Sequence, residues 1–285
     1  MGTTVIKSYA KINICLNVLG KRKDGYHELD MVMLPIDLHD TILISKEKAN
    51  AKNHNITIDD FSVTSQQYNT VTSAIEKLQS KYEFNDLFRV FVHKNIPIQA
   101  GLGGGSSNAA FTVKAINKIL KLNAPDQELR ELCETLGGDV PFFVDCKPSR
   151  CKGIGEDCTP IEVKNDYYVL IIKPKAGCCT KDVYEEGDKI KLDVYDVEKV
   201  IDCLKNGDDE ELAKCIGNAL EKPALKFVPE IADIEKALRD FGFKIVMMSG
   251  SGSSVFALST DKNLVNNAFK TIEGNFKVIK AKVLR

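Results

Sequence analysis

A run of glycines is the feature of this sequence that most constrains its fold. Residues 97–110 read PIQAGLGGGSSNAA, and four of the five positions from Gly101 to Gly105 are glycine. Glycine adopts positive φ without penalty and lets other atoms approach the backbone closely. Apolar residues then recur at helical spacing, at Ala109, Ala110, Val113, Ile116 and Leu120. A glycine loop that leads into a helix N-terminus points unpaired N–H groups at an anion, so it predicts a phosphate site.

Two better-known phosphate motifs do not fit this loop. The Walker pattern G-x-x-x-x-G-K-[ST] is absent around it, and a dinucleotide fingerprint would need glycine where Ser106 stands. The alternative is a flexible hairpin or linker, but linkers do not usually join an apolar strand to an alanine-rich helix. A serine hydroxyl of Ser106 or Ser107 could also bind Mg²⁺, which prefers hard oxygen ligands, and we assign Ser107 to that role.

Composition excludes several functional classes. The chain has 285 residues with 39 basic and 40 acidic side chains, so a general nucleic-acid binder is disfavoured. Its charged fraction of 28% and hydrophobic fraction of 44% are typical of globular proteins, and no apolar run is long enough to span a membrane. Nine scattered cysteines form no zinc spacing. With no signal-like N-terminus, they indicate reduced, mostly buried thiols in a cytoplasmic protein.

Periodicity predicts strands and helices in both halves of the chain. In the first half we expect strands at 4–18, twice within 28–45 on either side of Pro35, at 55–59 and at 88–92. Helices are expected at 69–82, from about 106 to 122, and from an N-cap at Asp126 to a stop at Gly137. The second half predicts strands at 167–172, 244–249, 253–258 and 276–283, with helices at 194–220, 229–241 and 261–272. We therefore expect an α+β protein of two domains, residues 1–155 and 156–285.

Three further features become candidate parts of a functional site once the glycine loop is interpreted as a phosphate site. The segment Ser249–Ser254 reads SGSGSS, which is either an ordinary hairpin turn or a second wall around phosphate groups. Lys11 lies in a strand whose other face is apolar, where a solvated lysine is the alternative. Asp139 lies in GGDVP, where turn chemistry is the alternative. Phosphoryl transfer needs a group to orient or deprotonate the attacking hydroxyl and cations to spread charge, which makes Lys11 and Asp139 candidate catalytic residues.

These segments together resemble the GHMP small-molecule kinases. The resemblance rests on AKINICLNVLGKRKDGYHELDMVM near the N-terminus, on GLGGGSSNAA, on LGGDVPFF and on MSGSGSSVF. It implies an N-terminal domain like domain 2 of ribosomal protein S5 and a ferredoxin-like C-terminal domain. Within the superfamily it indicates the branch that uses ATP and Mg²⁺ to phosphorylate the 2-hydroxyl of a cytidine diphosphate-linked methylerythritol, in a cytoplasmic pathway that makes isoprenoids.

The resemblance also implies roles for individual residues. Asp139 matches the catalytic base of the family and Lys11 matches its partner. Residues of the ATP site would be Asn69, Lys94, Pro97, Ile98, Gln99, Ala100, Gly101, Leu102, Gly103, Gly104, Gly105, Ser106 and Ser107. Residues of the substrate site would be Asn13, Tyr26, His27, Tyr184, Ser251 and Gly252. Aromatic rings suit a cytosine face, in agreement with Tyr26 and Tyr184. As a lone residue, His27 would otherwise be read as surface polarity.

Three other functions compete with this interpretation. A sister kinase that acts on homoserine, mevalonate or a sugar is the nearest alternative. A catalytically silent ligand sensor on the same scaffold is another, although the presence of both Lys11 and Asp139 argues against it. An RNA-binding protein is suggested only by the S5-like domain shape and is disfavoured by the near-neutral charge. We expect no nucleic-acid or membrane partner, and a monomer or weak homodimer.

Overall fold

The chain folds into two compact units built from separated segments. The computed structural model describes residues 2–48, 51–59, 69–272, 274 and 276–285. The first unit comprises Met1–Ala10, His39–Ile96 and Gly103–Cys146, and the second comprises Lys11–Leu38, Pro97–Leu102 and Lys147–Arg285. Two long strands, β1 (Thr4–Lys21) and β2 (His27–Lys46), therefore contribute residues to both units. The domain boundary expected at residue 155 stays a prediction.

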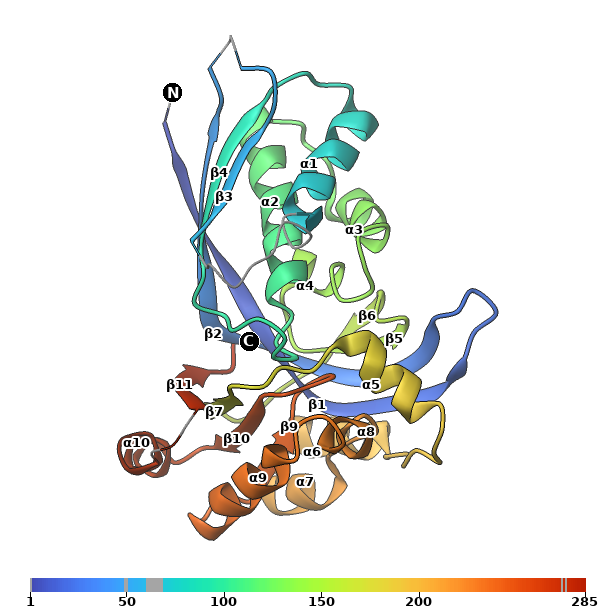
Figure 1. Cartoon of the computed structure of the whole chain (residues 1–285), viewed down its shortest axis with the longest axis vertical. Coiled ribbons are helices and arrows are strands. Elements are labelled where there is room, and N and C mark those ends of the chain that lie inside the picture. Colours follow the sequence, from blue (N-terminus) through green and yellow to red (C-terminus); the bar gives the residue numbers. More distant parts are fainter. Residues whose placement is uncertain (1, 49–50, 60–68, 273, 275) are drawn as a thin grey trace. The chain divides into compact units, whose positions relative to one another are not determined.

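In the first unit, helices cover one side of a small sheet (Figure 1). Strand β4 (Phe88–His93) pairs antiparallel with β2 from Thr41 to Lys46 and parallel with β3 (Asn55–Ile58). Alternate residues of β4 are buried and exposed, as expected for a strand with one covered face. The covering helices are α1 (Asn69–Tyr82), α2 (Gly104–Leu120), α3 (Asp126–Glu134) and α4 (Phe142–Asp145). Of the apolar stripe predicted for α2, Ala109, Ala110, Val113 and Ile116 are buried, and Leu120 at the end of the helix is half-buried.

In the second unit, the remaining parts of β1 and β2 form one sheet with short strands. Strand β5 (Ser149–Gly153) pairs antiparallel with β2 and with β6 (Asp157–Pro160), and β8 (Gly217–Asn218) pairs parallel with β1. Five helices lie between β7 (Tyr168–Pro174) and β9 (Ile245–Met248). They are α5 (Thr180–Gly187), α6 (Val197–Asn206), α7 (Asp209–Cys215), α8 (Glu221–Leu225) and α9 (Glu230–Asp240).

The second unit also contains an antiparallel sheet of four strands in the order β11-β7-β10-β9. These strands are β7 (Tyr168–Pro174), β9 (Ile245–Met248), β10 (Val255–Ser259) and β11 (Phe276–Lys282). Helices α9 and α10 (Lys262–Thr271) pack on it. When these four strands are numbered by their order in the chain, their order across the sheet is fourth, first, third, second. The connection from β7 to β9 and the connection from β10 to β11 both contain helices. This is the ferredoxin-like arrangement, so the expected α+β class is confirmed.

Several expected elements differ in the structure. Residues 28–45 were expected to form two strands but form the single strand β2, because Pro35 lies between the stretches that pair with β5 and β4, where its missing N–H costs no ladder bond. The helix expected at 194–220 divides into α6, α7 and β8. It breaks at Gly207, whose φ of 72° ends α6, and Asp208 then caps α7. The hairpin of β5 and β6 and helix α5 were not foreseen.

The predicted N-cap of α3 was wrong by one residue. Asp126 is the first residue of the helix, and Pro125 with an extended ψ of 152° occupies the cap position. Asp126 still places an acidic side chain in the first turn, where it interacts favourably with the helix dipole.

The expectation that all cysteines are reduced was wrong for one pair. Cys151 and Cys158 lie opposite each other on β5 and β6 and form a disulfide. The other seven cysteines are free. Burial raises the pKa of Cys15 and of Cys133 to about 12, so both thiols stay protonated and behave as small apolar groups. The seven-residue spacing alone could not show that a hairpin register brings Cys151 and Cys158 together.

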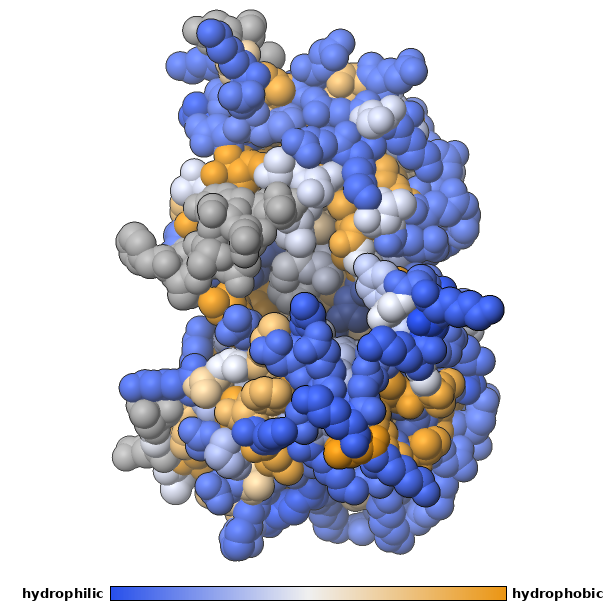
Figure 2. Space-filling model, turned by 45° about the vertical axis from the view of Figure 1, so that its right-hand side comes forward, coloured by the Kyte–Doolittle hydropathy of each residue, from blue (hydrophilic) through white to orange (hydrophobic). Residues whose placement is uncertain are grey.

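Among the described residues, no helix combines the length and the apolar character needed to cross a bilayer. On the face shown in Figure 2, hydrophilic side chains predominate and hydrophobic ones form separate patches. Single exposed apolar residues, such as Val5 and Val194, are normal for a folded domain.

Candidate active site

The first part of the glycine loop packs directly on the Ser249–Ser254 loop, and both belong to the second unit. The Ser249 hydroxyl donates to the Gly101 carbonyl at 3.0 Å. The backbone N–H groups of Ser253 and Ser254 donate to the carbonyls of Gln99 and Ala100 at 3.4 and 3.3 Å. A Cβ on Gly101 would lie 1.9 Å from the Ser249 carbonyl oxygen, so only glycine fits there. The Ser249–Ser254 segment is the turn that joins the antiparallel strands β9 and β10, so the hairpin interpretation is confirmed. The turn also packs on the glycine loop, and its role as a second wall around phosphate groups stays a prediction.

Lys11 lies beside these two loops rather than on a solvated strand face. Its side chain is 3% exposed, its Nζ donates to Asn13 Oδ1, and its N–H donates to the Leu102 carbonyl at 3.1 Å. A Cβ on Gly250 would lie 3.2 Å from Lys11 Nζ. A buried ammonium next to two glycine loops is suited to a polyanion, because the low local dielectric strengthens its attraction to negative charge.

The remaining residues of the Ser249–Ser254 loop are also fixed by hydrogen bonds. Thr180 Oγ1 lies 2.9 Å from Ser251 Oγ, and Ser253 Oγ donates to the Ala176 carbonyl at 2.6 Å. Asn218 donates to the carbonyls of Met248 and Gly250 at 3.0 and 2.8 Å. The predicted residues Ser251 and Gly252 therefore lie in a held loop, while Pro97 and Ile98 are half-buried in the turn that precedes the glycines.

The second part of the glycine loop starts α2 in the first unit. Gly103 has a φ of 70° and caps the helix, which begins at Gly104. The cap residue is a glycine, so it has no side chain that could accept a hydrogen bond from the first N–H groups of the helix. A Cβ on Gly104 would lie 3.3 Å from Lys94 Nζ, so the predicted nucleotide-site lysine does lie beside this helix N-terminus. A cation and the N–H groups of a first helical turn together favour a phosphate.

Lys94 is held by a buried carboxylate that the sequence did not single out. Its Nζ is paired with Asp40, and the two side chains are 7% and 0% exposed. Asp40 also accepts from the N–H groups of Asn95 and Ile96, both at 2.8 Å. The sequence shows Asp40 only as an acidic residue within an apolar stretch, and in the structure it lies within β2. In the structure it fixes the cation next to α2.

The predicted metal ligand Ser107 points inward. Its Oγ lies 2.7 Å from Ser8 Oγ and donates to the Tyr9 carbonyl at 2.6 Å, and the residue is fully buried. Ser106 is half-exposed instead. The described residues include no group of three or more His, Cys, Asp and Glu side chains able to hold a metal ion. The structure therefore gives the Ser107 metal role no support, and that role stays a prediction.

Asp139 lies in the turn between α3 and α4 in the first unit. The turn is closed by the Val140 N–H, which donates to the Gly137 carbonyl at 3.0 Å, and Asp139 itself is half-exposed. Pro141 is the N-cap of the short α4, which begins at Phe142. The turn expected as the alternative is present here, and the catalytic role of Asp139 stays a prediction. The other predicted residue, Asn69, opens α1, but its side chain lies outside the described part of the structure.

The residues predicted for cytidine binding gather at the β1–β2 hairpin and α5. The rings of His27 and Tyr184 are 4.8 Å apart between centroids and tilted by 30°. Tyr26 is 61% exposed, so its ring face is accessible. Asn13 lies on β1 beside Lys11 rather than with these aromatic residues. Asp188, which the sequence did not single out, lies 2.7 Å from His27 Nε2 through Oδ1 and 2.7 Å from Lys21 Nζ through Oδ2.

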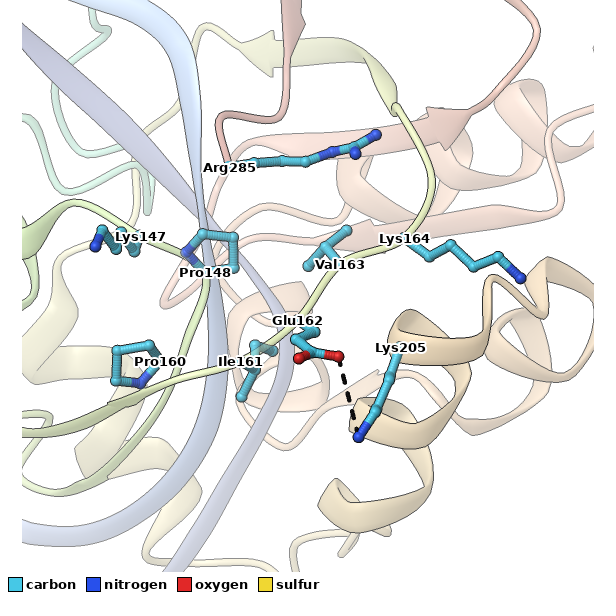
Figure 3. A pocket seen from close by; sticks show the side chains of 9 residues that line it. All are labelled: Lys147, Pro148, Pro160, Ile161, Glu162, Val163, Lys164, Lys205 and Arg285. Atoms are coloured by element: carbon cyan, nitrogen blue, oxygen red, sulfur yellow. Dashed lines mark ion pairs between the residues drawn. The ribbon is translucent and has the colours of Figure 1, made fainter.

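A separate pocket lies elsewhere in the second unit (Figure 3). It has a volume of about 470 Å³, and its wall contains Lys147, Lys164, Lys205 and Arg285 together with prolines and Val163. Lys205 is paired with Glu162 at 4.0 Å. None of the predicted site residues lines it, so the candidate active site is carried by the loops and not by this pocket.

Models of one known family match both segments of the chain that contain the two loops. The N-terminal domain model of the GHMP kinases matches residues 69–146, and the C-terminal model matches residues 200–278. Among solved structures, the crystal structure of 4-(cytidine 5'-diphospho)-2C-methyl-D-erythritol kinase has a TM-score of 0.81 and 26% identity over 98% of this chain and 99% of that chain. The mevalonate kinase of L. major in complex with R-mevalonate, at 15% identity over 99% and 96%, has a TM-score of 0.74 and shows the fold alone. These matches define a GHMP kinase.

Curated relatives narrow the assignment. The 4-diphosphocytidyl-2-C-methyl-D-erythritol kinase of Clostridium perfringens strain 13 is 35% identical over 95% of this chain and 94% of its own length. The protein of the same name from Bacillus pumilus is 35% identical over 94% and 92%. The chain thus belongs to the 4-diphosphocytidyl-2-C-methyl-D-erythritol kinase family within the GHMP kinases.

Proposed function

We propose that this protein transfers the γ-phosphate of ATP to the 2-hydroxyl of 4-diphosphocytidyl-2-C-methyl-D-erythritol, in the methylerythritol phosphate pathway to isoprenoids. One observation carries the proposal: relatives of that name are 35% identical over 95% of this chain. The packing of Gly101 against Ser249 beside buried Lys11 supports it.

The proposed step assigns a task to each group. Asp139 accepts the proton of the 2-hydroxyl while that oxygen attacks the γ-phosphorus, and ADP leaves with the bridging oxygen. Lys11 supplies positive charge to the hydroxyl oxygen and the phosphoryl group. The N–H groups at the start of α2, with Lys94 beside them, bind the nucleotide phosphates. A tertiary hydroxyl is a poor nucleophile, so a carboxylate held in position to accept its proton would favour the reaction.

Magnesium enters the proposal as part of the nucleotide. The described residues offer no acidic cage, so the ion would be held chiefly by phosphate oxygens and water, as Mg²⁺ often is. The half-exposed Ser106 hydroxyl is the protein oxygen at the start of α2 that could join them, whereas Ser107 would first have to leave Ser8 and Tyr9. Bound Mg²⁺ would neutralise charge on the transferred group.

A substrate panel tests the proposal. Purified protein is assayed for ADP release with ATP-Mg²⁺ and, in turn, the cytidylylated methylerythritol, homoserine, mevalonate and galactose. We expect turnover with the first compound alone. Turnover with one of the others but not with the first would transfer the assignment to a sister kinase.

A binding measurement distinguishes a catalytically silent ligand sensor from an active kinase. A sensor would bind the cytidylylated compound, measured by calorimetry, without releasing ADP under any condition. Turnover that is lost in an Asp139→Asn variant while binding persists would exclude the sensor.

The proposal includes a cytoplasmic enzyme, which the ATP requirement and seven free cysteines support. It also includes a monomer or weak homodimer, which sedimentation at micromolar concentration would test.

A further inference from the structure

Lys173 is a buried lysine that the proposed phosphoryl transfer does not use. It lies near the end of β7 and is 6% exposed. Its Nζ donates to the carbonyls of Pro174 and Ala176 at 2.7 and 2.8 Å. Within the described residues, no acidic side chain forms an ion pair with it. Lysine is seldom fully buried without a carboxylate partner, because desolvation of its charge is costly. The fold therefore retains a costly group that its own acidic residues do not stabilise.

The groups beside Lys173 do not neutralise its charge. Burial lowers the pKa of the Lys173 ammonium, and the nearby Cys178 opposes that shift. The Cys178 thiol is itself buried, which raises its pKa to about 11, so it carries no negative charge at neutral pH. The residue that β11 places opposite Lys173 is another cation, Lys277. A bound anion would supply the missing counter-charge and favour the ammonium form.

The Ala176 carbonyl connects Lys173 to the Ser249–Ser254 loop. This carbonyl accepts from Lys173 Nζ at 2.8 Å and from Ser253 Oγ at 2.6 Å. Ser253 is fully buried, and its N–H donates to the Gln99 carbonyl at 3.4 Å. One backbone carbonyl therefore separates the buried lysine from the loop that was predicted as a second wall around phosphate groups.

The segment that contains Ala176 also contacts both glycine loops closely. A Cβ on Gly177 would lie 2.6 Å from Gln99 Oε1, and a Cβ on Gly252 would lie 3.2 Å from Cys178 Sγ. All of these residues belong to the second unit. A cation that holds the Ala176 carbonyl therefore helps to fix the backbone against which both loops pack.

We propose that Lys173 is a positioning residue for phosphate groups: its ammonium holds the Ala176 carbonyl against the Ser249–Ser254 loop and supplies positive charge to a polyphosphate bound at that loop. The proposal rests on the proposed function, which brings two such ligands, the triphosphate of ATP and the diphosphate of the cytidylyl acceptor. The bound phosphate would be the counter-charge that the protein lacks at this position. Attraction through a buried region of low dielectric is strong and is screened little by salt.

The alternative role for Lys173 is structural support. In that role the ammonium stabilises the fold through the Pro174 and Ala176 carbonyls, so Lys173→Met would lower stability. If the charge serves a ligand instead, Lys173→Met removes a desolvated cation that no carboxylate compensates, and stability holds or rises. Lys173→Gln keeps a hydrogen-bond donor and removes the charge. The two variants therefore separate the ligand role from structural support.

The test measures nucleotide binding and stability in the full chain. Calorimetry gives Kd for ADP and for CDP, which represent the phosphates of the donor and of the acceptor. For Lys173→Met and Lys173→Gln we expect Kd to rise about tenfold for at least one nucleotide. The midpoint of urea unfolding should be no lower in Lys173→Met than in wild type. Lys277→Met removes an exposed charge on the neighbouring strand and should bind both nucleotides as wild type does.

The nucleotide that loses affinity identifies the source of the phosphates. A loss for ADP alone assigns the ATP phosphates to the Ser249–Ser254 loop, and a loss for CDP alone assigns the acceptor diphosphate to it. Unchanged Kd values for both nucleotides in the Lys173 variants would overturn the proposal. A urea midpoint that falls together with affinity in Lys173→Met would make the lysine a structural support, and an equal loss of affinity in Lys277→Met would make the effect one of net charge.

These measurements need no turnover, so they keep the inference distinct from the proposed function. If wild type turns over no cytidylyl compound but binds a nucleoside diphosphate more tightly than the Lys173 variants do, the proposed function fails and the inference stands. If wild type phosphorylates the cytidylyl compound and the variants bind ADP and CDP equally well, the proposed function stands and the inference fails. Wild type that binds neither nucleotide would also overturn the inference.

Discussion

Gly101 lies against the backbone of Ser249, so closely that a Cβ on Gly101 would be 1.9 Å from the Ser249 carbonyl oxygen. The glycine also has a φ of 71°, which side chains rarely adopt. Close approach and backbone conformation therefore both require glycine at this position, and they tie the glycine loop to a loop 148 residues further along the chain.

Gly101→Ala is expected to damage both folding and catalysis. The methyl group would push the two loops apart, which should cost about 3 kcal/mol of unfolding free energy and lower kcat/KM for ATP by about 100-fold. Urea unfolding and ADP-release assays measure the two effects. Gly105→Ala is the control for stability, because its Cβ would meet only Thr70 Oγ1 at 3.9 Å within the first turn of α2. Equal stability of the two variants would contradict the close contact.

Lys94→Met is expected to destabilise the first unit and weaken nucleotide binding. It would leave the Asp40 carboxylate buried without its cation, at a cost of about 3 kcal/mol, and would remove a positive charge from the start of α2. Unfolding in urea and KM for ATP are the measurements. Lys81→Met breaks a pair with Glu128 in which both side chains are at least a third exposed, and it should cost less than about 0.5 kcal/mol. A wild-type KM for ATP in Lys94→Met would remove Lys94 from the nucleotide site.

Asp139→Asn is expected to lower kcat by about 10²- to 10⁴-fold with little change in KM for the acceptor. The amide keeps the shape of the side chain but cannot take the proton of the attacking hydroxyl. Steady-state assays with varied acceptor check this, and calorimetry confirms that the acceptor still binds. Asp145→Asn offers a control, because that carboxylate is already paired with Arg130 at 2.8 Å on α3. A kcat within threefold of wild type would show that another group accepts the proton.

Stability is expected to fall between pH 5 and pH 8 because of one buried carboxyl group. Burial, and then the nearby charge of Glu221, raise the pKa of Glu235 to about 8. The folded state therefore holds a proton that the unfolded chain releases near pH 4.5, so this contribution is complete below that pH and is lost as the pH rises to about 8. Urea unfolding at pH 5 and pH 8 should show a loss on the order of 2 kcal/mol from this site.

The matched variant for this effect is Glu235→Gln, which stays neutral at every pH. Its unfolding free energy should vary less between pH 5 and pH 8 than that of wild type. The position of Glu235 favours a neutral group, since Oε1 is buried with no hydrogen-bond partner among the described side chains and Arg239 reaches the other oxygen only at 3.4 Å. An identical pH dependence in both proteins would assign the proton to a different group.

Features governed by local chemistry could be predicted from the sequence. The glycine loop, the apolar stripe of α2 and the four strands of the antiparallel sheet follow from residue spacing within short windows. The Asp139 turn follows from the glycines before it and the proline after it. The helix break at Gly207 was missed even though glycine and aspartate mark it, because apolar periodicity continues on both sides.

Pairings across long stretches of chain could not be predicted. Nothing near Cys151 indicates that β5 and β6 bring it opposite Cys158, because register is set by both strands together. Asp40 and Asp188 look like ordinary loop or turn acids, and only their partners Lys94 and His27 give them a role.

The sequence by itself determined that this chain contains a glycine loop that leads into a helix on an α+β scaffold, because backbone freedom and hydrophobic periodicity act over a few residues. The tertiary structure alone decided that Ser107 turns inward, that Lys11 is buried beside Gly250, and that Asp188 reaches His27. Those arrangements depend on which distant segments share buried space. Close packing and the need to satisfy buried polar groups settle that choice only once the whole chain has folded.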